Sequence, residues 1–372
     1  MTGEATPSPR PEPTRAGGRP GAPRRVAGVD AARGLAVLGM FAAHLGDPGH
    51  LDWSPSTWAA VVDGRSSVLF ATLAGVSVAL LSGGSRPVAG RELARARTRI
   101  LVRAAWVFAI GGVLELLDTS VAVILGVYAV LFVLALPFLR WPPRRLLLAA
   151  GVVALAGPPL TLAVARYATA RDEEGDPFTW LLATGYYPAL VWLAFVLVGL
   201  AVGRLDLRAG RVRAGLVAGG ALAAVLGYGG GWLSARLAGP GRRFGGMETG
   251  FASPGTWDPA WFAGAEPHSG TPFEVVGSTG VAVAVVGGCL VLADRLPRLT
   301  YPLASVGAMA LTVYTVQIAA IAVLDADPTA GWGTWARFAV TALVLAPAWR
   351  LQIGQGPLER LLTWSSRRTA GP

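Results

Sequence analysis

Ten mostly apolar segments divide the sequence, and no other feature restricts its fold as strongly. A helix of roughly 20 apolar residues is long enough to cross the hydrocarbon core of a bilayer. Inside that core a helix also satisfies its own backbone N–H and C=O groups, which irregular chain cannot do against lipid. We therefore predict an all-α, polytopic integral membrane helical bundle of about ten transmembrane helices. The predicted spans are 29–46, 66–83, 100–117, 119–139, 146–165, 187–203, 214–233, 274–293, 303–324 and 334–351.

Composition agrees with this prediction and excludes two other classes of protein. With 53% hydrophobic and only 15% charged residues, the chain has too little polar surface for a soluble globule. The net charge of +10 is spread between the apolar spans rather than gathered on one soluble face, so we expect no nucleic-acid partner. The single cysteine, Cys289, lies in an apolar run and is interpreted as a packing residue.

The distribution of arginine predicts the orientation of the chain. All 32 basic residues are arginines, and an even number of spans puts both termini on one side of the membrane. The N-terminal tail and alternate loops hold 24 of these arginines, the opposite loops hold seven, and Arg33 lies in the first span. By the positive-inside rule both termini are cytoplasmic. The arginine-only, Gly- and Ala-rich composition is typical of bacterial sequences, so we expect the bacterial plasma membrane.

Three regions are expected along the chain. Residues 1–25 hold six prolines and five arginines without an apolar run, which predicts a disordered cytoplasmic tail. This tail lacks the features of a signal peptide, so we expect the first span to remain as an uncleaved anchor. Residues 26–363 are expected to form one transmembrane domain, followed by a short cytoplasmic tail over 364–372.

The first span carries three polar side chains that need an explanation, Asp30, Arg33 and His44. Arg33 and His44 are eleven residues apart, so on a helix they share one face and differ in height by about 17 Å. Asp30 lies three residues before Arg33 and is expected to pair with it, which lowers the cost of placing charge there. The alternative is an interfacial ion pair together with a histidine that only touches lipid headgroups.

Histidines and glycines add further expectations. All three histidines, His44, His50 and His268, map to the predicted outer side. Because "HLGDPGHLD" contains no helical histidine pair and no nearby thiolate, we predict no metal site there. The pairs Gly111-Gly112, Gly219-Gly220 and Gly287-Gly288 are interpreted as points of close helix approach. "GYGGG" at 227–231 is interpreted as a break in the span 214–233.

The opening helix "VDAARGLAVLGMFAAH" resembles that of the heparan-alpha-glucosaminide N-acetyltransferase catalytic-domain family and its bacterial YeiB-like relatives. These proteins begin with an acid, then Arg-Gly, then an apolar run. The spacing Arg33-x10-His44 is also similar to the motif of the membrane O-acyltransferases of acyltransferase family three. Four further segments, which extend the resemblance to the end of the chain, are "GRSSVLFATLAGVSVAL", "PHSGTPFEVVGSTG", "PLASVGAMALTVYTVQ" and "GPLERLL".

The resemblance implies transfer of an acetyl or similar group from cytoplasmic acyl-CoA to an acceptor outside, a glycan or an amino sugar. In such a reaction His44 is the first candidate for the general base, or for an acyl-imidazole nucleophile. The animal enzymes have Asn at the position of His44 and their essential histidine further into the loop, a place that only His50 approaches. His50 and His268 therefore remain candidates, and Glu274 is expected to orient or assist the histidine.

Side-chain chemistry and the predicted sidedness give candidate residues for the two substrates of such a transfer. Arg33, with Asp30 beside it, and Arg103 are candidates for the acyl-CoA phosphates, against the alternative of ordinary positive-inside charge. On the outer side, the candidates for acceptor contacts are Arg65, Trp257, Trp261 and Gln317. The alternatives there are an interfacial aromatic belt for the tryptophans and an interhelical hydrogen bond for the glutamine.

Two other functions stay open at this point. A transporter would use Asp30, Arg33, Glu115 and Gln317 as relay or substrate groups and would need no acyl-CoA. A non-catalytic scaffold would bind partners through its basic cytoplasmic loops. In each case the lipid bilayer is a partner, and the sequence leaves a homo-oligomer open.

Overall fold

The computed structural model of the chain describes residues 26–46, 54–171, 176–239, 262–326 and 331–371, and every regular element within these ranges is helical. The elements are α1 (Ala27–Leu45), η1 (Pro55–Val62), α2 (Arg65–Leu81), α3 (Gly90–Glu115), α4 (Leu125–Leu134), η2 (Leu136–Phe138), α5 (Pro143–Thr169), α6 (Pro177–Thr179), η3 (Trp180–Thr184), α7 (Ala189–Gly203), α8 (Gly210–Ala238), α9 (Pro272–Arg295), α10 (Pro297–Ala308), α11 (Ala310–Leu324), α12 (Trp332–Gln352) and α13 (Pro357–Ala370).

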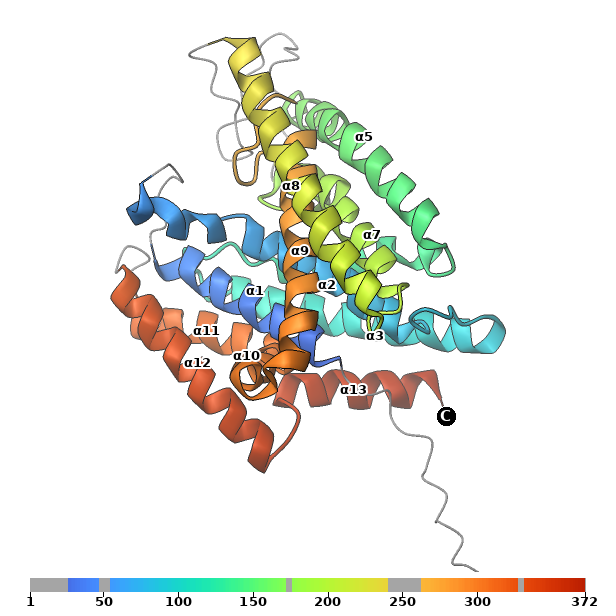
Figure 1. Cartoon of the computed structure of the whole chain (residues 1–372), viewed down its shortest axis with the longest axis vertical. Helices are drawn as coiled ribbons and strands as arrows, with labels where there is room; N and C mark the ends of the chain where they lie inside the picture. The colour runs from blue at the N-terminus through green and yellow to red at the C-terminus, as the bar shows by residue number, and fades with distance from the viewer. Residues whose placement is uncertain (1–25, 47–53, 172–175, 240–261, 327–330, 372) are drawn as a thin grey trace, which may run out of the picture.

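The helices α1, α2 and α7 form the centre of the bundle. α2 packs along α7, α1 packs along α10, and α8 and α9 run side by side as the most extensive helix pair (Figure 1). α5, α8 and α12 lie at the periphery and expose large apolar side chains, among them Leu155, Val225 and Val344. Exposing so much apolar surface to water is unfavourable, so we expect these faces of the three helices to contact lipid.

Local sequence explains where several helices begin. Pro143, Pro272, Pro297 and Pro357 each lie in the first turn of a helix, where no backbone N–H is needed for an internal bond. Thr271 caps α9 by accepting a hydrogen bond from the Glu274 N–H at 3.1 Å. These signals fix the start of α9 close to the predicted boundary.

The chain is a multi-pass membrane protein, although its spans are less regular than predicted. By length and composition, four helices of the described residues can cross a membrane, and six if each of two bent pairs counts as one span. The single predicted span 303–324 consists of α10 and α11, which are bent by 71°. Within 119–139 only Leu125–Leu134 forms an α-helix. The count of ten spans and the orientation of the termini remain predictions.

The glycines serve helix packing, and the predicted helix break at 227–231 is wrong. α8 runs without interruption from Gly210 to Ala238. A Cβ atom at Gly227 would collide with the backbone of Gly277 in α9. In each of the three predicted pairs one glycine, namely Gly111, Gly220 or Gly287, meets a neighbouring helix, while the other has no atom within 4 Å. These glycines therefore permit close packing.

One arginine that the charge count assigned to a cytoplasmic loop is buried. Arg204, at the end of α7, is 5% exposed. Its guanidinium donates to the carbonyl oxygens of Ala79 (3.0 Å) and Gly84 (2.7 Å), to that of Leu139, and to the Ser82 hydroxyl (2.8 Å). Arg204 thus ties the C-terminal end of α2 and the residues that follow it to α7, where its positive charge complements the negative end of the helix dipole.

The contact between α2 and α7 yields a stability prediction. A Cβ atom at Gly199 would collide with the Thr72 carbonyl group, whereas Gly219 on α8 has no atom within 4 Å. We expect Gly199→Ala to lower the free energy of unfolding by about 1–3 kcal/mol, because the two backbones must separate. Thermal unfolding of the detergent-solubilised protein measures this loss. Gly219→Ala is the control and should unfold at or slightly above the wild-type temperature. Equal unfolding temperatures for Gly199→Ala and Gly219→Ala would contradict the prediction.

Candidate active site

The break between α10 and α11 places unpaired backbone groups inside the bundle, and α1 supplies the partner for one of them. Arg33 Nη1 donates to the Gly307 carbonyl oxygen at 3.2 Å and to Asp30 Oδ1 at 2.9 Å. Its Nη2 donates to the Ser77 hydroxyl of α2 at 2.9 Å. The predicted Asp30–Arg33 pair is therefore confirmed, and it links α1, α2 and the end of α10.

The other side of the break is closed by the C-terminal helix α13. Glu359 Oε1 accepts hydrogen bonds from the backbone N–H groups of Leu311 (2.8 Å) and Thr312 (3.1 Å), the first turn of α11. Glu359 Oε2 accepts from the Thr312 hydroxyl at 2.6 Å. A carboxylate at this position satisfies free donors and complements the positive end of the helix dipole.

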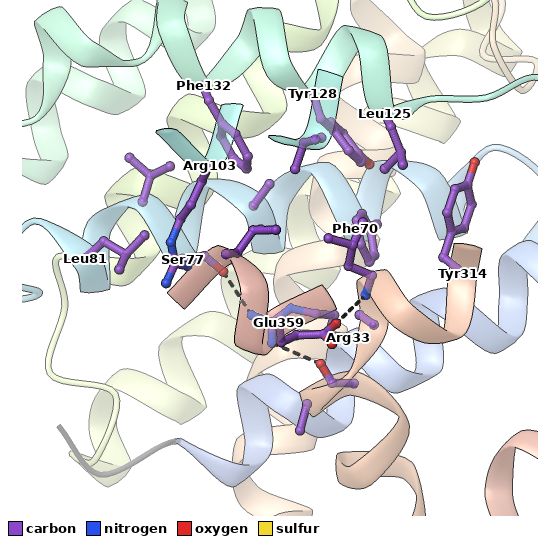
Figure 2. Close-up of a pocket in the computed structure, with 18 of the residues that line it drawn as sticks. Arg33, Phe70, Ser77, Leu81, Arg103, Leu125, Tyr128, Phe132, Tyr314 and Glu359 are labelled. Carbon is purple, nitrogen blue, oxygen red and sulfur yellow. Dashed lines mark hydrogen bonds between the residues drawn. The ribbon is translucent and has the colours of Figure 1, made fainter. Parts of the chain in front are cut away.

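A cavity of about 300 Å³ lies against this break. Its walls come from α1, α2, α3, α4, the α10–α11 junction and α13. Figure 2 shows Leu81 and Arg103 at one end of the cavity, Arg33 and Glu359 along one side, and Tyr314 at the opposite end. The remaining wall is mostly apolar and includes Phe70, Leu125, Tyr128 and Phe132. The cavity can therefore hold a slender ligand with a polar end and an apolar stem.

The end of the cavity that holds Arg103 carries positive charge. Arg103 lines this end, Arg33 lies along the adjoining side, paired with Asp30, and Arg33, Arg99 and Arg367 act on Arg103 electrostatically. Within the described ranges no carboxylate lies within 4 Å of Arg103, and its Nε has no hydrogen-bond partner there. Arginines gathered from α1, α3 and α13 form a site suited to a phosphorylated ligand.

His44 lies next to the end of the cavity that Tyr314 lines, opposite Arg103. Its ring packs edge-on against the Tyr314 ring, which lines the cavity, with 6.4 Å between the ring centroids. His44 Nδ1 is 3.3 Å from Gln317 Oε1 and 3.2 Å from Gln317 Nε2. Gln317 is only 2% exposed, so its amide is held in place, whereas His44 is half-buried. When Nδ1–H donates to Oε1, the lone pair of Nε2 is free to accept a proton.

A second polar network joins three other predicted residues, Glu274, Arg65 and His268. The Ser278 hydroxyl lies 3.4 Å from Glu274 Oε1 and 2.8 Å from the Tyr228 hydroxyl. Arg65 Nε donates to that Tyr228 hydroxyl at 3.0 Å, and Arg65 Nη1 donates to the Asp63 carbonyl oxygen at 3.2 Å. His268 Nε2 is 3.7 Å from Asp63 Oδ1.

Aromatic rings enclose the histidine of this network. Tyr186 and Tyr187 lie 4.5 and 5.7 Å from the His268 ring, centroid to centroid, and Trp192 stacks on it at 6.5 Å. The His268 side chain is 10% exposed, and Glu274 is 4% exposed. The network is therefore a well-packed polar core that connects η1, α2, α8 and α9.

The structure thus sorts the predicted residues into groups. Asp30, Arg33 and Arg103 line the cavity, and His44 and Gln317 adjoin its other end. His50, Trp257 and Trp261 lie outside the described residues. Over the part of the chain that is described, no group of three or more His, Cys, Asp or Glu side chains can hold a metal ion.

Sequence reasoning missed Glu359 and Ser77. Glu359 lies in "GPLERLL", where Pro357 opens a helix, so an acid in the first turn reads as ordinary helix stabilisation. Ser77 lies in the middle of an apolar span and carries no signal except its polarity. Only the packing of distant helices reveals that these side chains meet the break.

Comparison with family models divides the chain into two matched parts. Residues 25–231 match the family described as "Heparan-alpha-glucosaminide N-acetyltransferase, catalytic". Residues 250–368 match a family described as "Protein of unknown function (DUF418)". No curated protein matches the sequence. The first match covers α1 to α8 up to Gly231, and the second covers the helices that contribute Gln317 and Glu359.

The role of Glu359 leads to a stability prediction. Glu359→Ala should lower the free energy of unfolding by about 1–3 kcal/mol, because the N–H groups of Leu311 and Thr312 lose their acceptor in a dry environment. Glu359→Gln keeps one acceptor oxygen and should lose less. Thermal unfolding in detergent checks both values. The control is Glu92→Ala, which removes an exposed ion pair with Arg95 and should change stability little. If Glu92→Ala loses as much unfolding free energy as Glu359→Ala, the role assigned to Glu359 is wrong.

Proposed function

Because the chain belongs to the heparan-alpha-glucosaminide N-acetyltransferase catalytic family, with a YeiB-like C-terminal part, we propose that it is an acyl-CoA-dependent membrane acyltransferase. It takes an acetyl or similar acyl group from cytoplasmic acyl-CoA and transfers it to a glycan or amino sugar on the other side of the bacterial plasma membrane. One observation carries the proposal. The cavity extends from a cluster of arginines at one end to Tyr314, beside His44, at the other.

The arginine end suits the donor. Coenzyme A carries several phosphates on its nucleotide and a long, weakly polar pantetheine arm that ends in the thioester. Arg33, Arg103 and their neighbours Arg99 and Arg367 supply guanidinium groups for the phosphates. The mostly apolar wall suits the arm. Arg33 and His44 are separated by about 17 Å of helix, so an extended arm can bring the thioester to the histidine.

At the histidine end the chemistry is addition and elimination at the thioester carbonyl. Nε2 of neutral His44 takes the proton from the acceptor's hydroxyl or amino group as that group attacks the carbonyl carbon. The carbon–sulfur bond then breaks, and the imidazolium returns the proton to the departing thiolate. The products are the acylated acceptor and free coenzyme A. In the two-step alternative, His44 first accepts the acyl group as an acyl-imidazole and the acceptor then removes it.

We choose His44 over His268 because of their surroundings. His44 is half-buried, is oriented by Gln317 and packs on a side chain of the cavity wall. His268 is packed among three aromatic rings beside Asp63, an arrangement that fixes a structural residue. Glu274 belongs to the same network and is assigned the same supporting role. Arg65, Trp257 and Trp261 remain our candidates for contacts to the acceptor.

A transporter is the rival function, and one observation favours it. Bent or discontinuous helices within the membrane are typical of transporters, and α10 and α11 form such a pair. In this chain, however, the Gly307 carbonyl group already accepts a hydrogen bond from Arg33, and the first N–H groups of α11 already donate to Glu359. These groups are therefore not available to a transported solute. Solute flux into vesicles without acyl-CoA would support the rival and count against the transferase.

The first test is thiol release from acetyl-CoA by the purified protein, with and without glucosamine as acceptor. We expect slow release by the wild type and a loss of about 10²–10⁴-fold in His44→Ala, because the general base is removed. His268→Ala and His50→Ala serve as comparisons and should retain more activity than His44→Ala in protein that remains folded. If His44→Ala keeps full activity while another variant loses it, the base is not His44.

A second test separates binding from chemistry. Arg103→Ala should raise the KM for acetyl-CoA about tenfold or more with a smaller change in kcat, because a phosphate contact is made in both the ground and transition states. Arg140→Ala, at an exposed arginine that follows η2 and is absent from the cavity wall, is the matched control and should leave KM unchanged. A KM that stays at the wild-type value in Arg103→Ala would remove this arginine from the donor site.

A further inference from the structure

A second and larger cavity lies on the other side of α11. It is a groove of about 820 Å³ between α11 and α12, and Phe41 of α1 also lines it. The two helices diverge, and α12 contacts α10 and α1 more than it contacts α11. The α12 residues that line the groove recur every three or four positions, so one face of that helix forms its wall. These residues are Thr334, Arg337, Phe338, Thr341, Ala342, Leu345, Ala346 and Trp349.

The groove is mostly apolar along its length and charged at one end. Val313, Val316, Ala320 and Leu324 form the α11 wall, and Phe338, Leu345 and their neighbours form the wall opposite. Arg337 is exposed at the N-terminal end of α12 and donates to the Thr334 hydroxyl at 3.0 Å. No carboxylate among the described residues lies within 4 Å of Arg337. Its charge is therefore available to an anion.

α12 covers the predicted span 334–351 but is not among the candidate crossings counted above, so its place in the membrane is argued from its tryptophans. Trp332 and Trp335 pack edge-on near the start of α12, with 5.6 Å between their centroids, and Trp349 lies near its end. From Trp332 to Trp349 the helix rises about 25 Å, close to the thickness of the hydrocarbon core. Tryptophans at both ends of such a length form the belt that marks the two interfaces. Arg337 lies one to two turns inside one belt, within reach of a lipid phosphate.

From these observations we propose that the groove between α11 and α12 binds one anionic phospholipid, with a hydrocarbon chain along the groove and the phosphate at Arg337. An apolar channel with one unpaired cation at the membrane boundary matches both parts of that molecule. The α12 residues that line the groove extend over about 22 Å of helix, from Thr334 to Trp349. A lipid hydrocarbon chain that spans one leaflet is about 15 Å long, so the groove is long enough for it. The guanidinium can bind phosphate oxygens in a bidentate manner.

This lipid site goes beyond the proposed acyl transfer, because lipid binding requires neither acyl-CoA nor His44. Gln317 nevertheless belongs to both places, since it lines the groove and holds the His44 ring. A chain in the groove therefore lies against the residue that orients the proposed base. The binding measurement is made without acyl-CoA, so failure of either idea leaves the other testable.

The experiment is native mass spectrometry of the detergent-purified protein after delipidation and addition of phosphatidylglycerol or phosphatidylcholine. We expect one phosphatidylglycerol per chain and a clear preference over phosphatidylcholine. Arg337→Gln should lower phosphatidylglycerol occupancy about tenfold by removing the charge. Ala342→Trp should lower it strongly by obstructing the groove partway along its length. Arg236→Gln, an exposed arginine at the end of α8, and Val225→Trp, on the lipid-facing side of α8, are the matched controls and should bind as the wild type.

A second measurement on the wild-type protein does not depend on the folding of any variant. Phosphatidylglycerol with a photoactivatable group on its chain should cross-link to peptides of α11 and α12. Cross-links confined to α5 or α8, or equal retention of the two phospholipids, would overturn the proposal. Unchanged binding in a folded Ala342→Trp variant would do the same. If equimolar polyprenyl phosphate displaces phosphatidylglycerol, the proposal of a phospholipid is wrong and the groove binds a polyprenyl phosphate instead.

Discussion

A helix that breaks inside a membrane leaves backbone groups without partners, and the break between α10 and α11 controls the organisation of this protein. The Gly307 carbonyl group is satisfied by Arg33 from the first helix, and the first N–H groups of α11 are satisfied by Glu359 from the last. Lipid would offer neither partner. The ends of the described chain are therefore drawn to one point, and the cavity lies where they meet.

The parts of the site that lie on one helix could be predicted from the sequence. The period and rise of a helix fix the angle and height between Asp30, Arg33 and His44 before any packing is known. The same rule places Tyr314 and Gln317 on one face of α11, and both contact His44. The membrane class followed from the apolar runs, and the family from the motif at the start of the chain.

The parts that depend on distant helices could not be predicted. The bend at Met309 was not predicted, because Pro302 was placed just before, and Gly307 within, a single mostly apolar span. Arg204 was counted among the loop arginines, yet it is buried against four backbone and hydroxyl groups of α2 and its neighbours. The glycines at 227–231 looked like a break because helix propensity treats glycine alone, whereas here their small size lets α8 approach α9.

The position of Glu359 along the chain has a consequence for biogenesis. Among the residues that line the cavity, only Leu362 and Thr363 follow it. A ribosome that inserts this protein from its N-terminus therefore releases α10 and α11 before the cap of α11 exists. Until α13 docks, the break has exposed N–H groups and the cavity lacks one wall. The order of synthesis thus makes closure of the cavity one of the last steps in folding, after the rest of the bundle has entered the bilayer.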